Sequence, residues 1–200
     1  MRKITAAILL GLLPLSAVAE PVIVAPSSAL GCKLTPMLSS MEENYPGPDK
    51  IIKSNMMSRP AGKAVFAEGE RLFFMGKVLD ERCMPVEGAH IELWQTDARG
   101  QYGVATPGEL NAPSAAFAGT GTAVTNNLGE FQFDTIFPGP YEDRAPHVNL
   151  RITHPDLVPL TTEIFFRNDR RNVSDPRLMA LAPDLRDRLE AIVHAQEITN

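Results

Sequence analysis

The stretch of sequence that decides the fold is FAGTGTAVTNNLGEFQFDTIFPGPYEDRAPHVNLRI, residues 117–152. Within it, Phe131 and Phe133 stand on either side of a glutamine, directly after the turn-forming residues Asn-Asn-Leu-Gly at 126–129. Turn residues followed by alternating apolar and polar side chains are typical of a β-strand that follows a tight turn. Residues 147–153 alternate in the same way. The stretch therefore predicts β-structure with one apolar face.

The segment 147–153 divides its residues between two faces, because successive side chains of a strand point to opposite sides. One face carries Val148, Leu150 and Ile152, and the other carries His147, Asn149 and Arg151. Taken alone, the polar set is what the solvent-facing side of a half-buried strand looks like. That reading is the plain alternative to any role in binding.

Other segments extend the pattern to an all-β sandwich. Further strands are expected at 71–79, 89–95 and 160–166, and the residues Thr106–Thr120, which are rich in Gly, Ala, Pro and Ser, are expected to form a loop. Short strands separated by turns are typical of a sandwich. Residues 177–196 are expected to form a short helical tail, interrupted at Pro183.

The composition agrees with a turn-rich globular protein. The 200 residues include 14 Gly and 17 Pro, with 44% hydrophobic and 22% charged residues. The formal net charge of −5 argues against a nucleic-acid-binding surface, which normally needs a basic stripe. After the first residues the sequence has no second long apolar run to span a membrane.

The first residues have the pattern of a secretory signal peptide. Arg2 and Lys3 precede an apolar run at 4–15, and Ala-Val-Ala at 17–19 supplies the small residues of a cleavage site after Ala19. We expect export to the periplasm or out of the cell. The predicted division is a signal peptide at 1–19, an irregular proline-rich N-terminal arm at 20–62, and one sandwich domain at 63–200.

Export bears on the two cysteines, Cys32 and Cys83. An oxidising compartment favours a disulfide between them. Such a bridge would close a loop of about fifty residues and contribute on the order of 4 kcal/mol in the chain-entropy description. Two unpaired thiols are the alternative.

Two tyrosines stand close to turns near the strand at 147–153. Tyr102 follows an Arg-Gly turn, and Tyr141 follows Pro-Gly-Pro at 138–140. His147 and Asn149 share one face of the strand about 7 Å apart, so the four side chains could converge on one metal. Phenolate is a hard anionic donor that suits ferric iron.

These residues carry a resemblance to a known family. The segments GKVLDERCMPVEGAHIELWQTDARGQY (76–102), the stretch 117–152 quoted above, and LTTEIFF (160–166) resemble the intradiol ring-cleavage dioxygenases, and most closely their exported, protocatechuate-dioxygenase-like branch. The resemblance runs from about residue 34 to about residue 182. It implies a β-sandwich that holds a mononuclear non-haem Fe(III) with two tyrosines and two histidines.

The resemblance assigns a role to each matching position. Tyr102 matches the equatorial tyrosinate and Tyr141 the axial tyrosinate, which leaves the iron when substrate binds. His147 matches the equatorial histidine. Arg144 matches the arginine that steadies negative charge on the ring during oxygen attack.

Two positions depart from the family pattern. Asn149 stands where a second histidine is expected, and Glu163 stands where relatives usually have glutamine. An amide oxygen is a weaker donor than imidazole, so iron affinity should fall, and Asn149 Oδ1 or a water would fill the fourth position. Glu163 would either add a carboxylate near the metal or hydrogen-bond Arg144. The expected metal ligands are Tyr102, Tyr141, His147 and Asn149, and the expected catalytic residues are Arg144, Tyr141 and Glu163.

The resemblance implies a dioxygenase that inserts both atoms of O2 into a catechol-type aromatic and gives a muconate-type diacid. Its partners would be a small aromatic diol and O2, with no nucleic acid. The alternative is a catalytically silent or metal-altered binding protein of the same fold, favoured by the two departures. The sequence leaves the assembly open between a monomer and a homo-oligomer.

Overall fold

The structure is a computed structural model of the chain. It describes the following residues and leaves the others aside. The described residues are 2–12, for which only the backbone is considered, and 32–38, 45, 50–60, 62, 64–103 and 116–195. No helix within these residues is long and apolar enough to cross a membrane.

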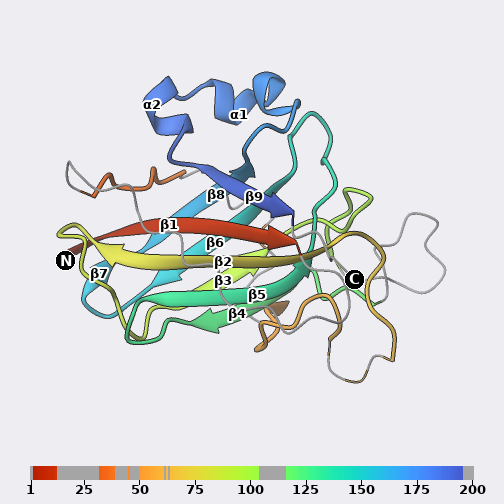
Figure 1. The fold of residues 1–200 in the computed structure, drawn as a ribbon, viewed down its shortest axis with the longest axis horizontal. Coiled ribbons are helices and arrows are strands. Elements are labelled where there is room, and N and C mark those ends of the chain that lie inside the picture. The colour runs from red at the N-terminus through yellow and green to blue at the C-terminus, as the bar shows by residue number, and fades with distance from the viewer. Residues whose placement is uncertain are drawn as a thin grey trace.

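Strands dominate the described residues, with a few short helical turns near the C-terminal end (Figure 1). The strands are β1 (Arg2–Leu12), β2 (Arg71–Asp80), β3 (His90–Trp94), β4 (Thr120–Val124), β5 (Glu130–Ile136), β6 (His147–Thr153), β7 (Leu157–Val158), β8 (Leu160–Phe166) and β9 (Glu190–Ala195). The helical elements are η3 (Asn172–Ser174), α1 (Pro176–Met179) and α2 (Pro183–Arg186).

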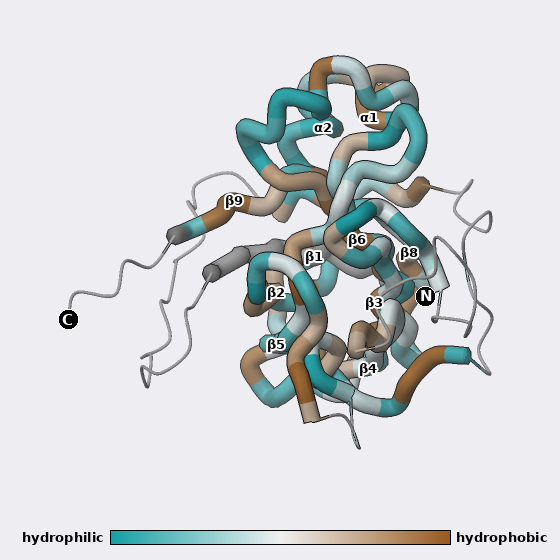
Figure 2. The backbone as a smooth tube through the Cα atoms, turned by 90° about the vertical axis from the view of Figure 1, so that its right-hand side faces the viewer, coloured by the Kyte–Doolittle hydropathy of each residue, from teal (hydrophilic) through white to brown (hydrophobic). Residues whose placement is uncertain are grey.

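The strands form two layers that share one strand. Along the sheet the order is β4-β3-β6-β8-β9-β1-β2-β5, with β7 paired to β1. Because β9 pairs with both β8 and β1, it joins the β4-β3-β6-β8 layer to the β1-β2-β5 layer. Seen edge-on, the two layers stand beside each other with α1 and α2 over one end (Figure 2). The predicted all-β sandwich is confirmed.

The space between the layers holds the core, supplied by alternating residues of facing strands. From β2 come Leu72, Phe74 and Val78, and from β6 come Val148, Leu150 and Ile152, all fully buried. The predicted apolar face of β6 is therefore the core face. The five predicted strands correspond to β2, β3, β5, β6 and β8, while β4 and β7 were not expected. Both are short, and β4 is built from Thr, Gly, Ala and Val, which give no clear alternation.

The C-terminal tail differs from the expected helix. Only α1 and α2 are helical, and Pro183 begins α2 instead of interrupting a longer helix. The residues after them form β9. Leu189 and Ala191 are both fully buried, which is the two-residue period of a strand, and backbone pairing with β8 and β1 replaces helical hydrogen bonding.

In the uncut chain, Arg2–Leu12 forms β1, which lies between β2 and β9. An apolar run of this length can pair as a strand as well as serve as a leader, so the signal peptide remains a prediction. The expected cleavage site at Ala19 lies outside the described residues.

The described part of the arm lies against the domain. Met57 and Ser58 donate their backbone N–H groups to the carbonyl oxygen of Asp134 in β5, at 2.7 and 3.0 Å. Cys32 and Cys83 form a disulfide that ties residue 32 of the arm to the turn after β2. The bridge is therefore confirmed, whereas the boundary between arm and domain at residue 62 stays a prediction.

Candidate metal and oxygenase site

The polar face of β6 is the floor of the candidate site. In the sheet, Asn149 of β6 lies directly between Trp94 of β3 and Glu163 of β8. Side chains of directly paired residues lie on the same face, and His147 shares that face two residues earlier. His147 and Asn149 are each only 4% exposed, and Glu163 is 1% exposed. The solvent-facing interpretation of this face is therefore wrong for these residues, although it holds for the exposed Arg151.

The first loop over this floor carries Tyr102. The side chain of Asp97, just after β3, accepts the backbone N–H groups of Arg99 at 2.9 Å and Gln101 at 3.0 Å, which fixes a tight turn. Gly100 has a φ of +81° in this turn, and a Cβ on it would overlap the carbonyl oxygen of Pro140. The turn therefore packs, backbone to backbone, on the loop that carries the second tyrosine.

The second loop holds Tyr141 beside Tyr102. Gly139 donates its N–H to the carbonyl oxygen of Asp97 at 2.8 Å, which joins the two loops again. Arg144 donates its backbone N–H to the carbonyl oxygen of Tyr141 at 2.8 Å. The rings of Tyr102 and Tyr141 meet edge to face, with centroids 5.1 Å apart. Residues from two separate turns thus meet above the start of β6.

Tyr102 connects the two polar side chains of β6. Its hydroxyl lies 3.2 Å from His147 Nε2 and accepts a hydrogen bond of 3.0 Å from Asn149 Nδ2. His147 Nδ1 lies 2.7 Å from the carbonyl oxygen of Ala145, so Nδ1 carries the proton. Nε2 then keeps its lone pair, directed at the Tyr102 oxygen. A histidine held through Nδ1 by a carbonyl is the usual arrangement of a metal-binding imidazole.

Burial sets the protonation of both groups. Burial lowers the pKa of His147 and outweighs the carboxylate of Glu163, so the ring is neutral at pH 7. Burial also raises the pKa of Tyr102 to about 12, against the lowering effect of the hydrogen bond from Asn149. Without a cation, Tyr102 is therefore a neutral phenol that donates a hydrogen bond to His147 Nε2.

Beside these groups lies a cluster of two arginines and two carboxylates, of which one arginine is partly exposed and the other three side chains are buried. Arg144 forms an ion pair with Glu163 through both carboxylate oxygens and a second with Asp175, Nε to Oδ2, at 3.0 Å. Arg177 donates from Nη1 to Glu163 Oε1 at 2.9 Å, an oxygen that also accepts from Arg144. Burial alone would lower the pKa of Arg144, but the two carboxylates outweigh it and raise it. Of the two roles expected for Glu163, the hydrogen bond to Arg144 is the one that the structure contains.

Asp175 and Arg177 were missed by sequence reasoning. Asp175 Oδ1 accepts the N–H groups of Arg177 and Leu178 and so caps α1, while its Oδ2 accepts the N–H of Ala145 at 2.8 Å. The Asp-Pro sequence at 175–176 is a signal for such a cap, but nothing local shows that the same carboxylate also holds Arg144.

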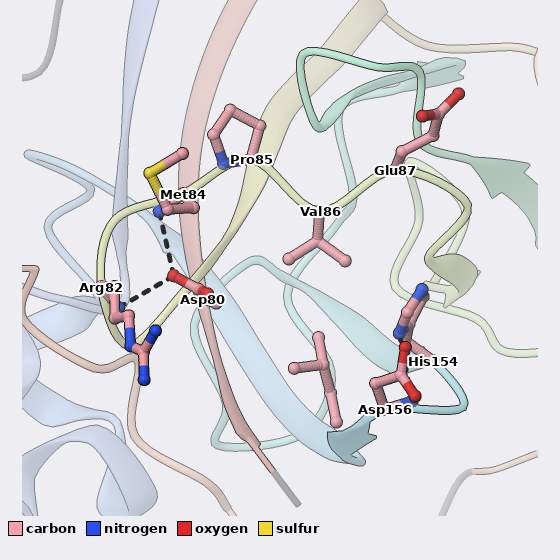
Figure 3. A pocket seen from close by; sticks show the side chains of 9 residues that line it. Asp80, Arg82, Met84, Pro85, Val86, Glu87, His154 and Asp156 are labelled. Carbon is pink, nitrogen blue, oxygen red and sulfur yellow. Dashed lines mark hydrogen bonds between the residues drawn. The ribbon is translucent and has the colours of Figure 1, made fainter.

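A separate pocket lies at the far end of the strands and does not take part in this site. It has a volume of about 380 Å³ and is lined by residues from the end of β2, the turn after it and the β6–β7 connection, among them Asp80, His154 and Asp156 (Figure 3). Asp80 Oδ1 is occupied by the backbone N–H groups of Arg82 and Met84. β6 runs from the candidate site at His147 toward this pocket, a length of roughly 20 Å.

The structure brings the expected site residues together. Tyr102, Tyr141, His147 and Asn149 converge, and Arg144 and Glu163 form an ion pair next to them. Within the described residues, no three His, Cys, Asp or Glu side chains gather as a metal-binding cluster. The candidate donors are therefore two phenols and one imidazole, with an amide beside them.

A β-sandwich in which two tyrosines meet beside a buried histidine is the arrangement that the resemblance to intradiol dioxygenases implies. Comparison with known proteins agrees with this class. A family model described as "Dioxygenase" matches residues 55–198. A Rickettsia conorii protein is 32% identical over 150 residues, covering 70% of this chain and 68% of that protein. Its name gives it as a dioxygenase and states no substrate. The protocatechuate 3,4-dioxygenase beta chain of Burkholderia cepacia is 32% identical over 130 residues, covering 60% and 55%.

Among solved structures, an intradiol ring-cleavage dioxygenase from Tetranychus urticae matches with a TM-score of 0.57 and 26% identity. The match covers 82% of this chain and 94% of the other. This chain belongs to the intradiol ring-cleavage dioxygenase family.

Proposed function

We propose that this protein is an intradiol ring-cleaving dioxygenase that uses a mononuclear non-haem Fe(III) to insert both atoms of O2 into a catechol-type aromatic, giving a muconate-type diacid. The observation that carries the proposal is the meeting of the Tyr102 oxygen with His147 Nε2, 3.2 Å apart, while the ring of Tyr102 packs edge to face on that of Tyr141. Family membership supports the reaction class. The reaction needs no external reductant, because both oxygen atoms remain in the product.

The donor set fits a ferric ion. His147 Nε2 offers a lone pair from a neutral ring, and a 3+ charge would displace the proton of Tyr102 despite its raised pKa. Tyr102, Tyr141 and His147 would hold the ion, and three protein ligands suffice at a catalytic metal site that keeps a position open for substrate. When bound, the ion supplies Lewis acidity and a template for the two substrate oxygens.

The protein residues do the remaining work. Tyr141 lies outside the named strands, and as a phenolate its oxygen would accept the proton of the substrate hydroxyl. Arg144 is fixed from both sides by Glu163 and Asp175, which holds its positive charge ready for the negative charge that develops on the ring. Tyr102 stays in place because Asp97 fixes its turn, and His147 stays in place because β6 and the Ala145 carbonyl hold it.

The test uses protein loaded with ferric iron and compares two tyrosine variants. We expect the wild type to show visible tyrosinate-to-iron absorption, which shifts when catechol is added, and to consume one O2 per catechol. Tyr102→Phe should lose most of the absorption and the oxygen uptake. Tyr45→Phe is the matched control, since Tyr45 bonds to Glu92 and not to His147. A colourless iron-treated wild type without oxygen uptake would refute the proposal.

A second candidate is a catalytically silent or metal-altered binding protein of the same fold. The observation that favours it is Asn149, which leaves one imidazole where the family pattern has two. It predicts a colourless protein that binds a phenolic ligand without consuming oxygen, or one that retains zinc or copper. Elemental analysis of protein purified without added metal separates these outcomes.

We also propose that the chain is exported with cleavage after Ala19. The charged start and the apolar run at 4–15 support this. Cell fractionation and the mass of the N-terminal peptide test it, because retention of residues 1–19 in the exported protein would contradict cleavage.

A further inference from the structure

The amide of Asn149 has both of its N–H groups occupied. Asn149 Nδ2 donates to the carbonyl oxygen of Trp94 and to the hydroxyl oxygen of Tyr102, each at 3.0 Å. Trp94 lies directly opposite Asn149 in the β3–β6 pair, so the carbonyl is a fixed part of the sheet. One side chain thus links a rigid strand to the oxygen of Tyr102.

These two contacts decide which end of the amide faces Tyr102. Turning the amide over would place Asn149 Oδ1 about 3.0 Å from the carbonyl oxygen of Trp94. Two acceptors would then meet with no hydrogen between them in a site shielded from water, which is unfavourable. The nitrogen therefore faces Tyr102, and an amide nitrogen that carries two hydrogens has no lone pair to offer a metal.

The surroundings hold the amide in this orientation. Asn149 is 4% exposed and lies between Trp94 and Glu163 on neighbouring strands. Presenting Oδ1 to a cation would require the side chain to leave the Trp94 carbonyl without a donor. The sequence comparison that assigned a ligand role to this position could not show this, because the position of the Trp94 carbonyl follows from the pairing of β3 with β6.

We propose that Asn149 is a positioning residue that donates a hydrogen bond to the Tyr102 oxygen, and that it does not occupy the fourth ligand position expected from the sequence. The metal is then held by three side chains, Tyr102, Tyr141 and His147. The part of this inference that concerns iron rests on the proposed function. The donor role of Asn149 toward Tyr102 does not, and it can be tested without metal.

The decisive variant is Asn149→Asp, which keeps the shape and exchanges the N–H donor for an acceptor. Ferric affinity is measured by competition against nitrilotriacetate. We expect the variant to bind iron about 10- to 100-fold more weakly, the usual effect of removing a partner that orients a ligand. Its tyrosinate-to-iron absorption should move to longer wavelength, because a phenolate without a hydrogen-bond donor gives up charge more readily.

The matched control is Asn172→Asp. Asn172 is also buried and donates from Nδ2 to a backbone carbonyl, that of Phe166, at 2.9 Å, but it does not contact Tyr102. We expect it to lose stability without a change in ferric affinity. If Asn149→Asp binds iron as tightly as the wild type, or more tightly, the N–H donor to Tyr102 is not needed to position that ligand, and the proposal is overturned.

A second measurement keeps the two proposals distinguishable. In the metal-free protein, the Asn149 side-chain amide signal in a 15N spectrum is identified by its loss in Asn149→Asp. We expect this signal to shift strongly in Tyr102→Phe and not in Tyr45→Phe. If the protein binds no iron but the amide signal shifts in this way, only the proposed function is refuted. If the amide signal is unchanged in Tyr102→Phe, the donor role of Asn149 is overturned.

Discussion

Tyr102 couples the stability of the metal-free protein to pH. Burial raises its pKa to about 12, whereas an exposed tyrosine titrates near 10. Because the folded pKa lies above the unfolded one, the neutral phenol stabilises the fold fully below pH 10, and this contribution is lost as the pH rises toward 12. We expect the wild type to lose about 1 kcal/mol from this residue by pH 11.

The measurement is urea unfolding of metal-free protein at pH 8.5 and pH 11, with Tyr102→Phe as the comparison. The variant is less stable at both pH values because it loses its bond to His147. Its loss of stability between the two pH values should nevertheless be smaller than that of the wild type by about 1 kcal/mol. An equal loss in both proteins would show that Tyr102 does not titrate abnormally.

Glu163 forms ion pairs with two arginines, the buried Arg144 and the partly exposed Arg177. Its carboxylate is 1% exposed and faces both Arg144 and Arg177. Glu163→Gln keeps the shape but leaves an excess positive charge, because Asp175 alone then opposes two guanidinium groups. Removing one member of a buried ionic cluster is costly, so we expect the free energy of unfolding to fall by about 2–3 kcal/mol.

Urea unfolding of the metal-free protein measures this loss, and Glu130→Gln is its control. Glu130 pairs with Lys77 at 2.9 Å, but both side chains are about 40% exposed, so the control should change stability by less than about 0.5 kcal/mol. Similar losses in the two variants would mean that breaking the ion pairs of Glu163 costs no more than breaking the exposed pair of Glu130 and Lys77.

At the scale of elements, the site depends on how closely two turns approach. The turn that carries Tyr102 and the turn that carries Tyr141 touch at Gly100, where a Cβ would overlap the Pro140 carbonyl. Gly88 has a similar positive φ of +75° but has open space around its Cβ position. Alanine at either position causes backbone strain of about 1 kcal/mol, but only Gly100→Ala must also push the two turns apart.

We therefore expect Gly100→Ala to lose more stability than Gly88→Ala and to bind ferric iron more weakly, because Tyr102 and Tyr141 separate. Thermal unfolding and the intensity of the tyrosinate-to-iron absorption measure the two effects. Normal iron binding in Gly100→Ala would show that the approach of the turns is not needed to bring the tyrosines together.

For the whole molecule, the strand pattern of the sequence predicts which residues face the core and which strand face carries the site. The alternation at 147–153 separates core residues from site residues correctly. It cannot show that His147 and Asn149 are buried, because part of their cover comes from the turn that carries Tyr102, which is 45 residues from His147 in the sequence. The strand β9 was missed for a related reason, since it forms only through pairing with distant β8 and β1.

The ionic cluster could not be predicted for the same physical reason. Asp175 lies 31 residues from Arg144, and its contact exists only because the N-cap of α1 lies against Arg144 and Ala145, just before β6. Local patterns report the period of an element and the chemistry of a turn. They do not report which turn covers which face, and that is what converts a row of polar residues into a site.

The disulfide acts on the chain as a whole. Cys32 and Cys83 are 51 residues apart, and the bridge closes a loop that would otherwise be free in the unfolded chain. The double variant Cys32→Ser/Cys83→Ser should unfold with a free energy lower by about 4 kcal/mol, because the unfolded chain regains the entropy of that loop. Ferric affinity should be unchanged, since neither cysteine contacts Tyr102 or His147.

Thermal unfolding with and without reductant measures this effect. Reductant should destabilise the wild type to about the level of the double variant and leave the variant unaffected. If reductant destabilises both proteins equally, its action does not pass through the bridge.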